Sequence, residues 1–64
     1  KGAHFHISAG GMESAIRIKD FKSASKQSVY LSLIEGVNLA KKYQDDFIEL
    51  WNFINSNQPY NSEE

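Results

Sequence analysis

Two adjacent glycines, Gly10 and Gly11, separate two short runs in which apolar and polar residues alternate. The first run covers residues 3–8 and the second covers residues 12–19. Alternation with a period of two residues indicates half-buried β-strands, and a Gly-Gly pair accepts the positive φ angles of a tight hairpin turn. The sequence therefore predicts an N-terminal antiparallel β-hairpin.

The apolar pattern also predicts the register of this hairpin. With the two glycines at the centre of the turn, Phe5 pairs with Ile16, and the large apolar side chains of both strands share one face. A slip by one residue would move one strand's apolar set to the opposite face. We expect that opposite face to be polar and basic, carrying His4, His6, Arg17 and Lys19.

Residues 26–56 carry apolar side chains at helical spacing, but the apolar stripe changes direction part-way along. The first set is Tyr30, Leu33, Ile34, Val37 and Ala40, and the second is Phe47, Leu50, Trp51 and Ile54. On a helical wheel the two sets point about 90° apart. We therefore expect a kink or a break between Lys42 and Asp46, with Asp46 and Glu49 as a capping box and Ser23 or Ser25 capping the helix start.

These elements predict the α+β fold class, with an N-terminal antiparallel β-hairpin packed on a long kinked or broken C-terminal helix. We expect one small α+β domain over residues 1–55 and a polar acidic tail, without fixed structure, over residues 56–64. Gly36 falls in mid-helix, where we expect it to allow close packing against the hairpin. The expected core consists of Phe5, Ile16, Ile18, Leu33, Val37, Phe47 and Trp51.

Length and composition exclude several classes of protein. A chain of 64 residues forms only one small core, so a two-domain enzyme is excluded. The chain has no Cys, which excludes a disulfide and a thiolate zinc site and is compatible with a cytoplasmic location. No apolar run approaches the roughly 20 residues that cross a bilayer, so we expect no membrane partner. All seven basic residues lie in residues 1–42, and five of the eight acidic residues lie in residues 43–64.

Two histidines on one strand face are the best candidates for chemistry. His4 or His6 could act as general acid and base in metal-free RNA cleavage, with Arg17 and Lys19 neutralising a phosphate. The same side chains also describe an ordinary solvated strand face. A stable metal site needs three or four ligands, and only Glu13 lies near the two histidines, so we expect no metal and no cofactor.

Two function classes remain open. The first and favoured class is a non-enzymatic interaction module, a homo-oligomer or the companion of another protein that completes the sheet, because a two-stranded hairpin is marginal alone and exposes its edges. The alternative is a small RNA-directed toxin that uses His4 or His6 with Arg17. Nucleic acid is therefore a possible partner, and an enzyme is the less favoured reading.

The segment Ala3-His4-Phe5-His6-Ile7, the strand Ser14-Ala15-Ile16-Arg17-Ile18 and the run around Trp51 resemble a family of small bacterial proteins. This is the domain-of-unknown-function family four-one-six-zero, whose members carry a Pro-His-Phe-His-Val strand and a C-terminal amphipathic helix ending near a Trp. The resemblance implies a protein encoded beside a second small protein, as in toxin–antitoxin gene pairs. Ala3 stands where that family has Pro. The family also has a strand ahead of the histidine motif, so we expect this chain to lack that N-terminal strand segment.

A weaker resemblance links Lys1-Gly2-Ala3-His4 to HicA-type messenger-RNA-cleaving toxins, in which a Gly-Ser-His strand supplies the catalytic His. Ala3 stands where that family has Ser. This resemblance implies the RNA-directed alternative, with His4 in the catalytic position.

Overall fold

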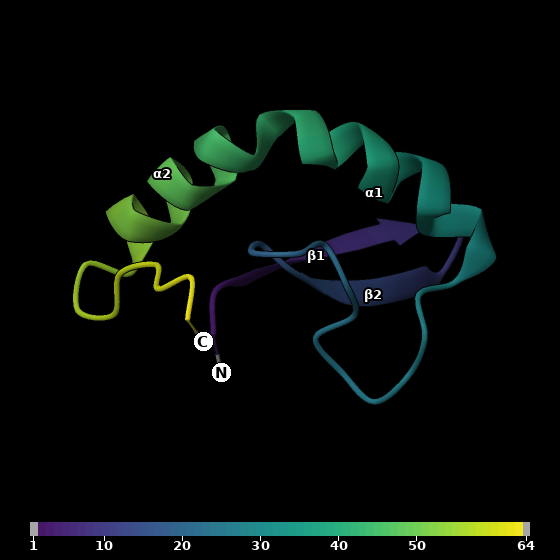
Figure 1. Ribbon diagram of the computed structural model, residues 1–64. Coiled ribbons are helices and arrows are strands. Elements are labelled where there is room, and N and C mark those ends of the chain that lie inside the picture. The colour runs from purple at the N-terminus through teal and green to yellow at the C-terminus, as the bar shows by residue number, and fades with distance from the viewer. Residues whose placement is uncertain (1, 64) are drawn as a thin grey trace.

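A hairpin lies beneath an arch of helices in the computed structural model, which describes residues 2–63 and leaves Lys1 and Glu64 outside the described part (Figure 1). The α+β class and the order of elements agree with the sequence pattern. In chain order the elements are β1 (His4–Ala9), β2 (Met12–Arg17), the 3-10 turn η1 (Leu31–Leu33), α1 (Ile34–Ala40), the 3-10 turn η2 (Lys41–Tyr43) and α2 (Gln44–Ile54).

The hairpin has the register expected from its apolar pattern. Phe5 pairs with Ile16 and His4 pairs with Arg17, so the strands β1 and β2 are antiparallel around a two-residue turn. Gly10 and Gly11 have φ angles of 58° and 82°, which is the left-handed backbone that a primed turn requires. This turn matches the right-handed twist of the two strands.

The segment after β2 returns to the outer edge of that strand before the chain reaches the helices. Its residues 22–24 run antiparallel along the outer edge of β2, with an isolated bridge between Ile16 and Ser23. The Arg17 N–H donates to the Lys22 carbonyl at 2.8 Å, and the Ala24 N–H donates to the Ala15 carbonyl at 2.7 Å. Strand β2 is thus hydrogen-bonded on both sides.

Phe21 makes the sharp turn that brings this segment back to β2. Its φ angle is 58°, a conformation that is costly for a residue with a large side chain. Its N–H donates to the Arg17 carbonyl at 2.8 Å, and its ring is only 8% exposed. The Phe21 ring packs edge-on against the stacked rings of Phe5 and Phe47, with centroids 5.9 and 6.4 Å away, and its burial offsets this backbone strain.

The helical region starts later than residue 26, and the expected serine caps are wrong. Helical structure begins at Leu31, and Tyr30 stands at the N-cap without a side-chain hydrogen bond. Ser23 instead accepts a hydrogen bond from the Ser25 N–H at 3.2 Å, and Ser25 accepts one from the Gln27 N–H at 3.3 Å. Such local hydrogen bonds compete with helix formation, because they satisfy the backbone in a turn.

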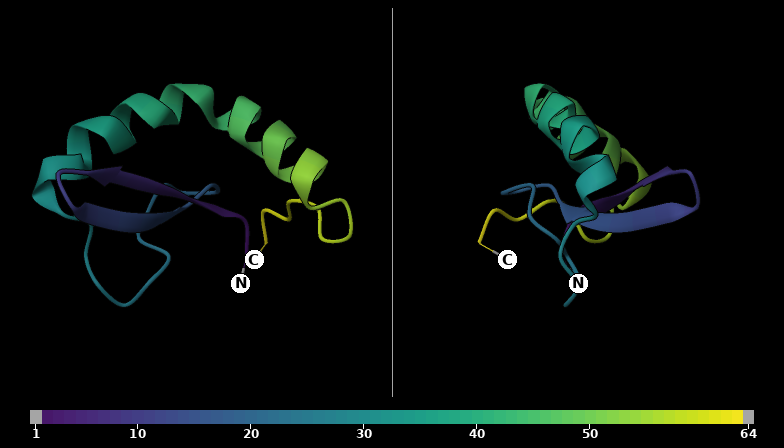
Figure 2. Two further views of the ribbon diagram at one scale, coloured as in Figure 1. Left: turned by 180° about the vertical axis from the view of Figure 1, so that it is seen from behind. Right: turned by 90° about the vertical axis from the view of Figure 1, so that its right-hand side faces the viewer.

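The expected interruption of the long helix is present as η2. Tyr43, at its end, has φ −117° and ψ 27°, outside the helical region, and α2 begins at Gln44. The expected capping box is wrong, because Asp46 lies inside the first turn of α2 and no side chain caps this helix. Seen from behind, α1, η2 and α2 arch over one face of the hairpin, while the loop between β2 and η1 extends away from it (Figure 2).

The core lies between the hairpin and this arch. Ile16, Ile18, Leu33 and Val37 are no more than 4% exposed, and Phe5 stacks on Phe47 at a centroid distance of 4.4 Å. A Cβ atom added at Gly36 would come within 2.7 Å of the Ile7 side chain, so α1 packs against β1 through this glycine. No helix within residues 2–63 has the length and apolar character needed to cross a membrane.

Trp51 is not the core residue that the sequence pattern predicted. Its side chain is half-buried, because α2 extends past the end of the hairpin (Figure 1). The Trp51 Nε1–H donates to the Gln58 carbonyl at 2.9 Å, and the Tyr60 N–H donates to Asn52 Oδ1 at 2.7 Å. The start of the C-terminal segment therefore returns to α2, which differs from the expected lack of structure there.

Candidate functional site

The two histidines of β1 lie side by side, with ring centroids 5.4 Å apart. His4 Nδ1 lies 3.0 Å from the Gly2 carbonyl, and the Trp51 ring lies 5.7 Å from the His4 ring. His4 is therefore half-buried, whereas His6 is exposed. The expectation that both histidines face water holds for His6 alone, because the overhanging end of α2 partly covers His4.

His6 pairs with an acidic residue of the neighbouring strand. His6 Nδ1 and Glu13 Oε2 are 2.9 Å apart, and both side chains are more than half exposed. Glu13 is diagonal to His6 in the hairpin register, as the sequence pattern places it. An exposed pair of this kind contributes little stability, but it leaves only one nitrogen of His6 for any other contact.

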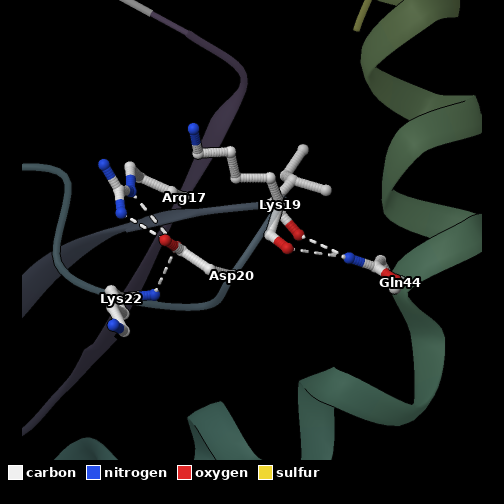
Figure 3. A network of polar contacts seen from close by, with 6 residues as sticks. Arg17, Lys19, Asp20, Lys22 and Gln44 are labelled. Atoms are coloured by element: carbon white, nitrogen blue, oxygen red, sulfur yellow. Dashed lines mark hydrogen bonds and ion pairs between the residues drawn. The ribbon is translucent and has the colours of Figure 1, made fainter. Parts of the chain in front are cut away.

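Arg17 is held by Asp20 in a two-pronged ion pair at the end of β2 (Figure 3). Arg17 Nε donates to Asp20 Oδ1 at 3.1 Å, while the Arg17 Nη2 donates to Asp20 Oδ2. The Lys22 N–H also donates to Asp20 Oδ1 at 3.1 Å. The hydrogen bond from Arg17 holds the pKa of the Asp20 carboxyl below its usual value, aided by the Lys22 N–H and opposed by partial burial.

Gln44 is a positioning residue that the sequence pattern did not single out. Its side-chain amide donates to the carbonyl of Ile18 at 2.9 Å and to the carbonyl of Lys19 at 3.3 Å (Figure 3). These bonds join the first residue of α2 to the turn after β2. In the sequence, Gln44 could have been recognised as a polar residue on the inward face of a helix, next to apolar core positions.

Lys19 and Arg17 lie beside a small cavity where the two ends of the chain approach each other. The cavity has a volume of about 140 Å³ and is lined by Gly2, Ala3, Arg17, Lys19, Ala24, Tyr60 and Asn61. One of its two cations, Arg17, already carries the Asp20 carboxylate. The basic face expected from the sequence is therefore partly neutralised.

The arrangement offers limited chemistry. No group of three or more His, Cys, Asp or Glu residues suitable for a metal ion occurs within residues 2–63. RNA cleavage by His4 or His6 needs an acid, a base and a free cation at the phosphate. Here His6 is paired with Glu13, and Arg17 is paired with Asp20. Of the side chains expected to act on RNA, His6 and Arg17 are thus held in ion pairs, while Lys19 lines the cavity.

The outer edge of β1 is a different kind of feature. The Ile18 N–H donates to the Ala3 carbonyl at 3.1 Å, so the pair Ala3 and Ile18 is hydrogen-bonded and the next pair, His4 and Arg17, is not. In an antiparallel hairpin the two kinds of pair alternate. The N–H and C=O groups of His4, His6 and Ser8 therefore point away from β2, to the open side of β1.

These outward groups have no hydrogen-bond partner among the residues that the structure describes, in contrast to the Arg17 N–H and C=O groups and the Ala15 carbonyl on β2. His6 and Ser8 are exposed. A row of unpaired backbone donors and acceptors at a sheet edge is a template for another strand. We name this feature the open edge, defined by the outward backbone groups of His4, His6 and Ser8.

Comparison of the chain with protein-family models, with curated proteins and with solved structures gives no match.

Proposed function

We propose that this protein is an interaction module that binds a partner through the open edge of β1. The observation that carries the proposal is the contrast between the two outer edges of the hairpin. Residues 21–24 bond both outward groups of Arg17 and the outward carbonyl of Ala15 on β2, whereas nothing within residues 2–63 bonds those of His4, His6 and Ser8 on β1. A strand added there gains main-chain hydrogen bonds and lengthens the sheet.

The resemblance to the bacterial family with the Pro-His-Phe-His-Val motif adds a biological setting to this proposal. In that setting the module is one half of a toxin–antitoxin-like pair in the bacterial cytoplasm. The small size of the core supports such a role, because a domain of this length gains only about 3–5 kcal/mol from its core. A partner that completes the sheet would add to this stability by mass action.

The test is a pull-down of an affinity-tagged chain that is co-expressed with an untagged copy of itself and with the product of the neighbouring reading frame, and either protein, if retained, is the partner. Ser8→Pro removes an outward N–H from the open edge and leaves every hydrogen bond of the described residues intact. Ser28→Pro is the matched control, because Ser28 is exposed and lies in the loop before η1. We expect the wild type and Ser28→Pro to retain the partner and Ser8→Pro to lose it. Equal retention by the two variants, or retention by neither wild type nor control, would contradict the proposal.

A second candidate function is RNA binding or cleavage, which the cavity lined by Arg17 and Lys19 favours. A salt titration with a labelled single-stranded RNA tests it, because log K falls linearly with log salt when cations contact phosphates. If Lys19 contacts a phosphate, Lys19→Gln reduces the slope by about one unit, whereas the control Lys26→Gln in the loop leaves it unchanged. Absence of binding at low salt would remove this candidate.

A further inference from the structure

We infer that the strand received by the open edge is β1 of a second copy of this chain. The two β1 strands pair antiparallel about a twofold axis through His6, giving a sheet in the order β2, β1, β1, β2. This inference rests on the proposed function and names its partner. Three features support it: the symmetry of the open edge, the presence of one such edge, and an apolar helix flank that lies above it.

The open edge is symmetric about His6. Its outward residues, His4, His6 and Ser8, are evenly spaced, so antiparallel pairing places His6 opposite His6 of the second copy and His4 opposite Ser8. Each outward N–H then meets a carbonyl. The same pairing keeps Phe5 and Ile7 of both copies on the face beneath the helices, because side chains alternate strictly along each strand.

Because the other edge of the hairpin is occupied by residues 22–24, addition of one strand closes the assembly. A hairpin open on both sides would continue to add copies and form a fibre. A single self-complementary edge instead gives an isologous twofold dimer, which is the commonest form of oligomer. The geometry therefore favours a dimer over a larger array.

Helix α1 shows which of its sides lies above the open edge. Gly36 contacts Ile7 of β1, whereas Val37, about 100° further round the helix, belongs to the buried cluster with Ile16 of β2. Leu39 lies about 60° from Gly36 in the opposite sense to Val37. Leu39 is therefore on the β1 side of the helix, above the open edge.

Helix α2 gives the same answer independently. Phe47 stacks on Phe5 of β1, whereas Gln44, about 60° away, bonds to the Ile18 carbonyl after β2. Leu50 and Ile54 lie beyond Phe47, on the side away from Gln44. The apolar flank above the open edge consists of Leu39, Tyr43 and Leu50, which are 57%, 51% and 53% exposed, and Ile54, 68% exposed, continues it along the overhanging end of α2.

The spacing of such a dimer suits contact between the two flanks. Strands lie about 4.8 Å apart, and each helix packs on both strands of its own hairpin, so its axis runs over the hairpin midline. The axes of the two helices are then two strand spacings apart, about 10 Å, within the usual distance for packed helices. The helix centre passes over His6, between Gly36 and Phe47, so Leu39 of one copy meets Tyr43 of the other.

The open edge and the apolar flank together form the surface that such a dimer would bury. A standard interface buries about 800 Å² on each partner, which is about a sixth of the 4954 Å² exposed by this chain. The strand of six residues and these large apolar side chains are the surfaces that such an interface would bury. Contacts of this size remove from water an apolar flank that is otherwise unusual on a monomer.

Cysteine cross-linking tests the register, because the chain contains no Cys of its own. Across the twofold axis, the two copies of residue 6 have Cα atoms about 5.5 Å apart, within disulfide range. The two copies of residue 8 are separated by about 13 Å along the strands, beyond that range. We expect His6→Cys to form a disulfide-linked dimer under mild oxidation and Ser8→Cys alone to remain uncoupled.

A mixed experiment provides the matched control. His4→Cys and Ser8→Cys face each other only between copies, so neither should cross-link alone and their mixture should form the linked heterodimer. Equal cross-linking of His6→Cys and Ser8→Cys, or none by His6→Cys and by the mixture, would overturn the inferred register. Circular dichroism of each variant verifies that it is folded.

Sedimentation equilibrium of the wild type separates this inference from the proposed function. We expect a dimer at about 100 μM, weakened at least tenfold by Ser8→Pro and by Leu39→Glu, and unaffected by Ser28→Pro. A monomer that still loses its neighbouring-frame partner on Ser8→Pro would overturn the second-copy inference and leave the proposed function standing. A monomer that retains no partner would overturn both.

Discussion

The two outer edges of the hairpin have the same regular backbone, but only the edge of β2 is hydrogen-bonded to another segment of the described chain. On β2, the connector returns through Phe21 and hydrogen-bonds to the outward groups of Arg17 and Ala15. On β1, the outward groups of His6 and Ser8 remain free within residues 2–63. The comparison shows that the chain accepts a strained backbone at Phe21 to close one edge and leaves the other available.

The largest expected effect concerns the closed side, where Ile16 lies between β1 and residues 22–24 and is 0% exposed. Ile16→Ala leaves a cavity and should cost about 2–5 kcal/mol, comparable to the whole stability of so small a domain. We expect the variant to be unfolded by circular dichroism at 25 °C. A cooperative melting transition like that of the wild type would contradict the assigned core.

A second test compares one backbone donor on each edge. Ala24→Pro removes the N–H that bonds to Ala15, whereas Ser8→Pro removes an N–H that has no partner in the described chain. Measured by urea unfolding at a concentration low enough for a monomer, the free energy of unfolding of Ala24→Pro should fall by about 1–1.5 kcal/mol, since the variant lacks one backbone hydrogen bond to the half-buried Ala15. Ser8→Pro should lose less than about 1 kcal/mol. The reverse order would mean that the edges are assigned wrongly.

A smaller effect is expected at the overhanging end of α2. Trp51 is half-buried against His4, so Trp51→Ala should cost about 1–2 kcal/mol rather than the larger amount typical of a core tryptophan. Phe53→Ala is the control. Because Phe53 is 84% exposed, this variant should change the free energy of unfolding by no more than about 0.5 kcal/mol. If thermal unfolding showed the same loss of stability for Trp51→Ala and Phe53→Ala, the packing of Trp51 against His4 would be contradicted.

These contrasts also explain which features were predictable from sequence. The alternation around Phe5 and Ile16 and the Gly-Gly pair act locally, so the hairpin register could be predicted. The interruption of the helix could also be predicted, because the apolar stripe changes direction there. The positions of His4, His6, Arg17 and Lys19 on one face follow from the same register.

Features that depend on distant packing could not be predicted. The closing of the β2 edge needs Phe21 at positive φ, a conformation that sequence rules assign to Gly. The half-burial of Trp51 depends on how far α2 extends past the hairpin, and the ion pair of Arg17 with Asp20 depends on the turn that follows β2. The sequence pattern predicted two exposed edges, and the closing of one of them depends on the return of residues 22–24 to β2.

The smallest expected effect is a pH dependence of the free energy of unfolding, caused by the ion pair of Arg17 with Asp20 beside the edge of β2. The pKa of Asp20 is lower in the folded state, so its pair with Arg17 stabilises the fold above the ordinary carboxyl pKa of about 4. This contribution should disappear as pH falls through the lowered pKa of the folded state. Urea unfolding of the wild type and Asp20→Asn should therefore differ at pH 7 and converge in acid. A difference that grows on acidification would contradict the assigned pair.

Residue-resolved amide hydrogen exchange tests the contrast between the two edges most directly. In dilute solution, we expect the N–H groups of Arg17 and Ala24 to be protected and those of His6 and Ser8 to exchange rapidly. As the protein concentration rises and dimers form, the amides of His6 and Ser8 should become protected, while those of Arg17 and Ala24 change little. Protection of His6 and Ser8 in dilute solution equal to that of Arg17 would contradict the open edge.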